Sequence, residues 1–175
     1  MDSQELTCLL KSDNLVKKKF TNKIYCYDTL PRRLQRGKFY IANTRSSKSN
    51  FQEEAGHWIL YLFYANSNKL VFIDPFGLFP EKKFILPMLR SGNKNTSFFY
   101  NNLQLQNFST TTCGQHVLMI ATLFGHNYDI LSIFNDFYKV NDHVGNSNNF
   151  KYDEIVNHFL LKHFHETRGI FWDDF

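Results

Sequence analysis

Two apolar segments joined by a short polar turn do most to limit what this chain can fold into. His57–Tyr64 (HWILYLFY) is apolar at nearly every position, and Lys69–Ile73 (KLVFI) follows it after Ala65–Asn68. Segments of this length, rich in Ile, Val, Phe and Tyr, are typical of a β-hairpin. Because the first strand has no polar face, other elements must cover both of its faces. The sequence therefore predicts a central sheet flanked by helices.

The other elements alternate less regularly along the chain. Two further strands are expected, at Lys38–Ala42 and Phe98–Leu105. The patterns predict five helices: Ser3–Lys11 with Ser3 as N-cap, Pro80–Leu89 with an interruption at Pro87, Cys113–Phe124, Asp129–Tyr138 and Tyr152–His163. A helix, then mixed strands, then helices predicts an α+β fold. The 175 residues contain no clear linker, so we expect one domain over residues 1–175.

Composition excludes several classes of protein. With 43% hydrophobic and 21% charged residues, the chain is neither disordered nor a coiled coil. No apolar run approaches the roughly 18–20 residues that cross a bilayer. The three cysteines are too few for a secreted disulfide framework, so we expect a soluble intracellular protein. They also lack the spacing of zinc ligands, and His158, His163 and His165 do not share one helical face, so no metal site is expected.

A hydroxyl-rich segment, Ser109–Thr112, directly precedes Cys113 and an apolar helix. Ser and Thr in this position are natural N-caps, which would place Cys113 in the first helical turn. The unpaired backbone amides and the helix dipole favour negative charge there, so the pKa of the thiol should fall. Gly114 would allow close approach of a substrate backbone. On this evidence a nucleophile and a plain buried cysteine are about equally consistent with the position.

A nucleophilic cysteine needs a base, and His57 stands out among the seven histidines because it opens a strand. His116 lies on the helix of Cys113 itself, where it is poorly placed to reach a leaving group. Asp74 ends the partner strand. If the hairpin loop holds two or four residues, His57 lies opposite Phe76, and Asp74 is its diagonal neighbour within reach of a hydrogen bond. A turn-forming Asp before proline is the alternative for Asp74.

An oxyanion would need a further donor near Cys113. Gln106, seven residues earlier, is placed to direct its side-chain amide, together with the backbone N–H of Cys113, at a substrate carbonyl oxygen. Gln104 competes for this role because it lies two residues back on the same strand face. Taken alone, either glutamine is more often a surface residue.

In their order His, Asp, Gln, Cys, these residues resemble the adenovirus endopeptidase (adenain) family of cysteine proteases, which also occurs in Maverick/Polinton virus-like elements and shares a clan with the SUMO-deconjugating proteases. Segments 41–63, 69–79 and 105–114 and the apolar helix that follows carry the likeness, which covers roughly residues 3–125. The resemblance implies a papain-like α+β fold with a central mixed sheet.

The resemblance also implies a role for each candidate residue. His57 would be the general base, Asp74 its orienting carboxylate, Cys113 the nucleophile and Gln106 the oxyanion donor, favoured over Gln104 by its spacing of seven. The carboxylate is Glu in the best-known members and Asp here. Substrate contacts are expected from three residues: Gly56, Trp58 and Gly114.

Family members cleave viral precursor proteins at Gly-containing sites during particle maturation. The resemblance therefore implies a monomeric endopeptidase of capsid or core precursors, located in the host nucleus or the virion, with no required cofactor. The alternatives are a SUMO-type deconjugating protease and a non-enzymatic DNA- or capsid-binding protein with a degenerate protease fold.

DNA and a short viral peptide stimulate the adenoviral enzymes, so the resemblance suggests both as activators. The peptide attaches through a disulfide to a cysteine before the catalytic one, a role that only Cys8 or Cys26 could take here. The net charge is +4. Short basic clusters at 17–19, 32–38 and 82–83 are candidate DNA contacts, although solvated surface is the commoner reading of such clusters.

Overall fold

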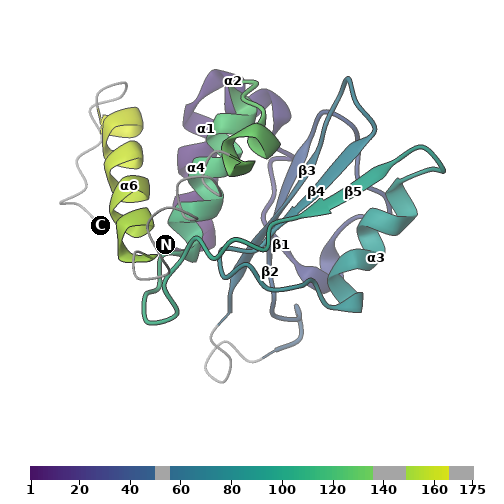
Figure 1. Ribbon diagram of the computed structural model, residues 1–175, viewed down its shortest axis with the longest axis horizontal. Helices are drawn as coiled ribbons and strands as arrows, with labels where there is room; N and C mark the ends of the chain where they lie inside the picture. Colours follow the sequence, from purple (N-terminus) through teal and green to yellow (C-terminus); the bar gives the residue numbers. More distant parts are fainter. Residues whose placement is uncertain (50–55, 136–148, 166–175) are drawn as a thin grey trace.

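A five-stranded sheet forms the middle of the molecule in this computed structural model, which describes residues 1–49, 56–135 and 149–165 (Figure 1). The strands are β1 (Tyr25–Cys26), β2 (Phe39–Asn43), β3 (Trp58–Phe63), β4 (Lys69–Ile73) and β5 (Ser97–Tyr100). They lie side by side in chain order, with antiparallel pairing of β2, β3 and β4 and parallel pairing of both edge strands. The predicted α+β class with a central mixed sheet is confirmed.

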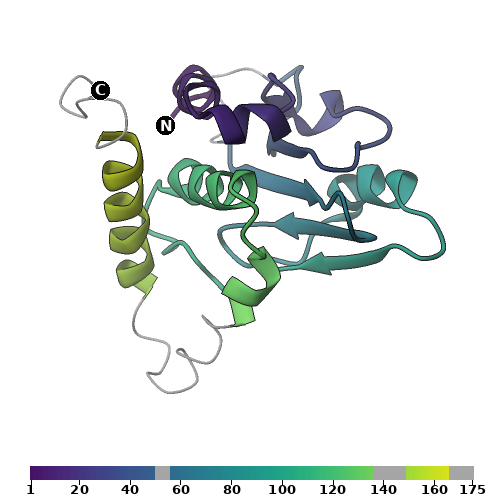
Figure 2. The same ribbon diagram turned by 90° about the horizontal axis from the view of Figure 1, so that it is seen from above.

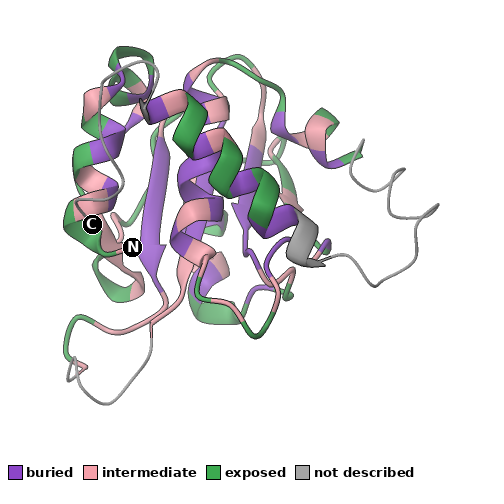
Figure 3. Ribbon diagram, turned by 90° about the vertical axis from the view of Figure 1, so that its left-hand side faces the viewer, coloured by how far each residue is buried: buried purple, intermediate pink, exposed green. Residues whose placement is uncertain are grey.

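Helices cover both faces of the sheet, as the apolar strands require (Figures 1 and 2). The helices are α1 (Ser3–Ser12), α2 (Asn14–Lys19), α3 (Lys82–Ser91), α4 (Cys113–Gly125) and α6 (Asn149–Leu160), with the short segments η1 (Tyr27–Thr29) and η2 (Leu161–His165). Residues 130–135 are also helical. On one face α1, α2, α4 and α6 share a core with alternate strand residues, and on the other face α3 packs against the intervening ones. In Figure 3 the strands of the sheet are buried and lie behind helices whose outer faces are exposed.

The hairpin of β3 and β4 has the connection on which the candidate site depends. Leu60 pairs with Ile73 and Phe63 with Leu70, and the Tyr64 N–H donates to the Lys69 carbonyl oxygen at 3.1 Å. Four residues remain in the loop. Continued by three positions, this register sets residue 57 opposite residue 76, so one of the two loop lengths that favour a His57–Asp74 contact is realised.

Several predicted boundaries are wrong in informative ways. The first helix is capped by Asp2, whose carboxylate accepts from the backbone N–H groups of Gln4 and Glu5, rather than by Ser3. The strand expected to reach Leu105 ends at Tyr100. Helix α3 continues through Pro87, which is buried with its neighbours against the sheet, so tertiary packing offsets the local cost of proline.

The remaining predicted helices agree in position. Helix α6 starts three residues before the predicted Tyr152, and the last three residues of the predicted helix Asp129–Tyr138 lie outside the described residues. Three elements were not predicted: α2, with six residues, β1, with two, and η1, with three, are too short to show a period. Over the described ranges, no helix has both the length and the apolar character to cross a membrane.

Candidate active site

The hairpin brings His57 and Asp74 together at one end of the sheet. The His57 Nε2–H donates to Asp74 Oδ1 over 2.7 Å. The two side chains are only 16% and 11% exposed, so water screens the contact weakly. This is the diagonal contact that the sequence predicts. Because Nε2 is held by the carboxylate, Nδ1 is the ring nitrogen left to face a thiol.

Asp74 is itself held rigidly. Its Oδ1 also accepts the backbone N–H of Phe76 at 2.8 Å. The side chain of Asn101, which is 3% exposed, accepts the Asp74 backbone N–H at 2.8 Å and donates to the Asp74 carbonyl oxygen at 2.6 Å. Asn101 was not among the predicted site residues; its one signal in the sequence is a polar residue directly after an aromatic strand. It fixes the backbone from which the carboxylate projects.

Cys113 is the first residue of α4 and lies near enough to His57 for each group to shift the pKa of the other. Burial alone would raise the pKa of the thiol. The hydrogen bond and charge of His57 and the backbone N–H groups of Trp58 and Gly114 outweigh that effect, so the pKa of Cys113 falls below its ordinary value. The site therefore favours a thiolate facing an imidazolium.

The pKa of His57 shifts in the opposite direction. Burial disfavours the charged ring, but hydrogen bonds to Asp74 and Cys113 and the charges of both groups raise the pKa to about 9. Histidine in the unfolded chain has a pKa of roughly 6.5. Between that pH and about 9, the folded protein therefore keeps an imidazolium that the unfolded chain would have lost. The corresponding stability is complete below about pH 6.5 and is lost as the pH rises through about 9.

Cys113 should consequently react with iodoacetamide rapidly near neutral pH. The lowered pKa of its thiol leaves a larger thiolate fraction than an ordinary cysteine has, and peptide cleavage should decline as His57 loses its proton near pH 9. Mass-spectrometric mapping of alkylation rates across pH checks this, with the exposed Cys8 of the same sample as the internal comparison. Equal rates and equal pH dependence for the two thiols would contradict it.

The predicted N-capping by hydroxyl residues is wrong in detail. Thr112 occupies the N-cap position of α4 but makes no side-chain capping bond. Its hydroxyl donates to Asp153 of α6, and so does the Thr110 hydroxyl, at 3.0 Å. The buried carboxylate of Asp153, 41 residues after Thr112, therefore anchors the loop that leads to Cys113.

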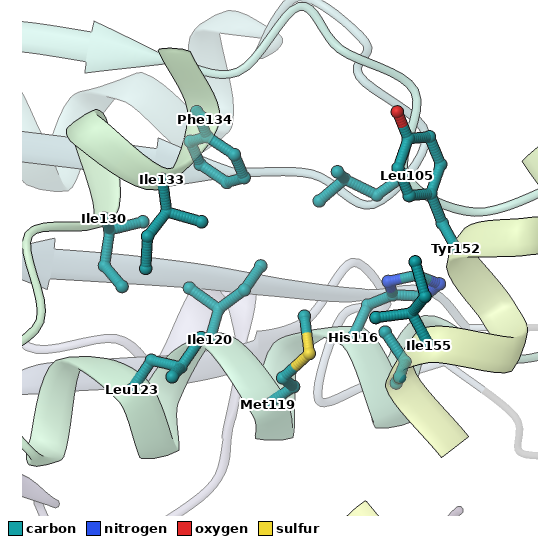
Figure 4. Close-up of a pocket in the computed structure, with 11 residues that line it drawn as sticks. Leu105, His116, Met119, Ile120, Leu123, Ile130, Ile133, Phe134, Tyr152 and Ile155 are labelled. Atoms are coloured by element: carbon teal, nitrogen blue, oxygen red, sulfur yellow. The ribbon is translucent and has the colours of Figure 1, made fainter. Parts of the chain in front are cut away.

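His116 completes this buried group. Its Nε2 lies 2.7 Å from Asp153 Oδ1, and the ring is 1% exposed at one end of an apolar pocket between α4, α6 and residues 130–135 (Figure 4). Burial lowers the pKa of His116 more than Asp153 raises it, so the ring is neutral near pH 7. His116 therefore bonds to Asp153 inside the core and serves the packing of α4 against α6. That His116 does not act as the base stays a prediction.

Gln106 lies in the loop before Cys113 and is 1% exposed. Its Nε2 donates to the Thr110 carbonyl oxygen at 2.6 Å, and its backbone N–H donates to the Pro75 carbonyl oxygen at 2.8 Å. Because a primary amide carries two N–H groups, one remains for an oxyanion. Gln104 is engaged elsewhere, with its Nε2 donating to the Gln106 carbonyl oxygen at 2.9 Å. The role of Gln106 stays a prediction.

Each of the three predicted substrate contacts adjoins a site residue in the chain: Gly56 and Trp58 flank His57, and Gly114 follows Cys113. A Cβ on Gly56 would meet the side-chain amide of Asn43 at 2.2 Å, so a larger residue here would displace that amide. A Cβ on Gly114 would lie 3.0 Å from Met1 Cβ and 3.3 Å from the Trp58 ring. The Trp58 Nε1–H donates to the Met1 carbonyl oxygen at 3.2 Å. Met1 was not predicted here, and it packs over the glycine next to Cys113.

An aromatic stack adjoins the imidazole. Phe76 lies parallel to His57 with ring centroids 4.3 Å apart, and Phe108 stacks on Phe76 at 5.1 Å. Phe108 is 63% exposed, so the stack runs from the half-buried imidazole out to solvent. The outer ring leaves an exposed apolar surface beside the site.

The basic clusters divide into structural and exposed residues. In α2 the ammonium of Lys19 donates to the Phe124 carbonyl oxygen at 2.6 Å and to the Asn127 side chain at 2.8 Å, whereas Lys17 and Lys18 are exposed. Lys19 therefore holds α2 against α4, and DNA binding by the exposed members stays a prediction.

No model of a known protein family and no curated protein matches the sequence. Among solved structures, the crystal structure of the selenomethionine-labelled ASFV pS273R protease aligns with a TM-score of 0.46 and 14% sequence identity. The alignment covers 74% of this chain and 59% of that one, so the chain spans less than two thirds of the length of that protein. A likeness of this degree assigns neither activity nor residues, and the function has to be argued from the geometry of His57, Asp74 and Cys113.

Proposed function

We propose that this chain is a cysteine endopeptidase that hydrolyses peptide bonds in viral or virus-like precursor proteins. One observation carries the proposal: the imidazole of His57 hydrogen-bonds to the carboxylate of Asp74 and lies near enough to the thiol of Cys113 for the two groups to shift each other's pKa. A carboxylate that holds an imidazole, and an imidazole that faces a thiol, form the arrangement that activates a cysteine for acyl transfer.

In the proposed reaction the Cys113 thiolate attacks the carbonyl carbon of the scissile bond. The oxygen becomes an oxyanion, which the Cys113 backbone N–H and the second N–H of Gln106 stabilise. The His57 imidazolium then gives its proton to the leaving amine, and a thioester remains. His57 then takes a proton from a water molecule, which attacks the thioester and releases the acid. This step restores the Cys113 thiolate and the His57 imidazolium.

Activity-based labelling tests the proposal. A peptide vinyl sulfone ending in glycine should modify Cys113 alone, and a Gly-containing precursor peptide should be cleaved. Cys8→Ala is the matched control, because Cys8 is exposed and far from Cys113 in the sequence. In this variant Cys113 should be labelled as in the parent. Modification confined to Cys8 or Cys26, with no cleavage of any peptide, would reject the proposal.

The choice of substrate distinguishes the alternatives. Faster turnover of a Gly-Gly modifier conjugate than of the precursor peptide would identify a deconjugating protease instead. Binding of DNA that survives alkylation of Cys113, without any peptidase activity, would identify a non-enzymatic protein.

A further inference from the structure

Three polar side chains far apart in the sequence converge at the end of α4 that is remote from Cys113. Asp13 lies between α1 and α2, His126 caps the C-terminus of α4, and His163 belongs to η2. Both imidazoles approach the same atom: each Nε2 is 2.8 Å from Asp13 Oδ2. One ligand-type atom from each residue lies within 4.8 Å of the other two.

The carboxylate of Asp13 is divided between two tasks. Its Oδ1 accepts the backbone N–H groups of Leu15 at 2.8 Å and Val16 at 3.2 Å, which caps α2. Its Oδ2 is thereby turned toward the two histidines. Asp13 thus accepts four hydrogen bonds, two on each carboxylate oxygen.

The rings are held in orientations that direct both Nε2 atoms inward. The ring of His163 stacks on Phe159 with an interplanar angle of 6° and meets Phe164 edge-on. The rings of His126 and His163 are nearly perpendicular, at 89°, with centroids 5.3 Å apart. Rings fixed by packing lose little freedom when a ligand binds, which is the condition for a preorganised site.

We propose that Asp13, His126 and His163 bind a divalent transition-metal ion, best suited to Zn²⁺. Two imidazole nitrogens and one carboxylate oxygen form a borderline ligand set that zinc accepts. The site needs distances of about 2.0–2.2 Å from the ion to each atom, so on binding each Nε2 must give up the proton that it shares with Asp13 and the three ligand atoms must move apart around the ion. The histidine side chains are 30% and 19% exposed, so water has access to the fourth tetrahedral position.

The ion would lie far from the proposed nucleophile. Cys113 begins α4 and His126 caps its far end, 13 residues on, which is about 20 Å at 1.5 Å per residue. A metal at this place joins α2, α4 and η2, and so fastens the C-terminal helical segment to the helix that carries the nucleophile. This inference does not depend on the proposed protease activity.

The spacing of histidines in one helix gave no indication of this site. His158, His163 and His165 do not share a face, and the prediction of no metal site rested on that observation and on the cysteines. The structure shows that the partners of His163 come instead from two other helices.

Zinc binding by the full chain in a Cys113→Ala background is the direct test, because removing the thiol prevents metal capture by Cys113 and His57. Titration calorimetry of the metal-free protein should give one saturable Zn²⁺ site, and Co²⁺ should show the visible spectrum of a tetrahedral ion. At free Zn²⁺ 100-fold above the dissociation constant, the unfolding equilibrium constant should fall about 100-fold.

Two variants and a control decide the assignment. Asp13→Asn keeps a capping side chain but loses the anion, and His126→Gln removes a half-exposed ligand; each should weaken Zn²⁺ binding at least about tenfold. His158→Gln, exposed on α6, should bind as the parent does. Absence of saturable binding at millimolar Zn²⁺, or unchanged affinity in the folded Asp13→Asn and His126→Gln proteins, would overturn the proposal and leave a hydrogen-bonded His–Asp–His cluster.

Discussion

Replacing Cys113 with alanine should lower kcat/KM for peptide cleavage by a factor on the order of 10³ or more while the protein stays folded. The thiolate is the only group that the proposed mechanism allows to form the acyl intermediate, and loss of a covalent nucleophile is among the most damaging changes an enzyme can undergo. The side chain is half-buried at the very start of α4, so its sulfur contributes less to stability than a core residue does. Cleavage rates and thermal unfolding of both proteins provide the measurement.

Cys26→Ala is the control for this experiment, because Cys26 is also half-buried and unpaired. It should retain the activity of the parent if no activating disulfide is involved in the assay. Cleavage by Cys113→Ala at a rate comparable to the parent would show that another residue is the nucleophile.

The contact of His57 with Asp74 could be predicted because it depends on local geometry. An apolar strand, a four-residue loop and a second strand fix the register, and the register decides which residues share a face. The position of Cys113 at a helix start follows from equally local signals. Two uncertainties, the loop length and the alternative of a turn-forming Asp74, separated the sequence from the geometry.

The supports of the site could not be predicted in this way. Asp153 reaches Thr110, Thr112 and His116 from a helix about 40 residues further along the chain, and no local period indicates which face of that helix meets the loop. The same applies to Met1 over Gly114. Contacts of this kind are settled by how helices pack on the sheet, and sequence patterns carry little information about them.

The hydroxyl residues before Cys113 illustrate the difference. Ser and Thr at this position indicate an N-cap on local grounds, and the helix does begin there. Their hydroxyls nevertheless bond to Asp153, because a buried carboxylate needs donors more than a helix start beside solvent does. Local propensity thus located the element correctly, and tertiary packing changed the bonds at its end.

Comparison of His57→Ala with His116→Ala should separate the catalytic histidine from the structural one. His57→Ala should lose at least about 100-fold in kcat/KM, the lower range for a general base. It should also slow alkylation of Cys113 at neutral pH, because the imidazole that lowers the pKa of the thiol is gone. Its free energy of unfolding should also fall at neutral pH, because the folded protein loses the imidazolium and Asp74 is left buried without that partner.

His116→Ala should lose stability but keep most of its catalytic activity. Removing the ring leaves Asp153 buried with only its two threonine donors, so the free energy of unfolding should fall by about 1–3 kcal/mol, while kcat/KM falls less than tenfold. Chemical denaturation and cleavage assays on both variants measure the two effects. A catalytic loss in His116→Ala that equals that of His57→Ala, with unchanged stability, would mean that the base has been assigned to the wrong histidine.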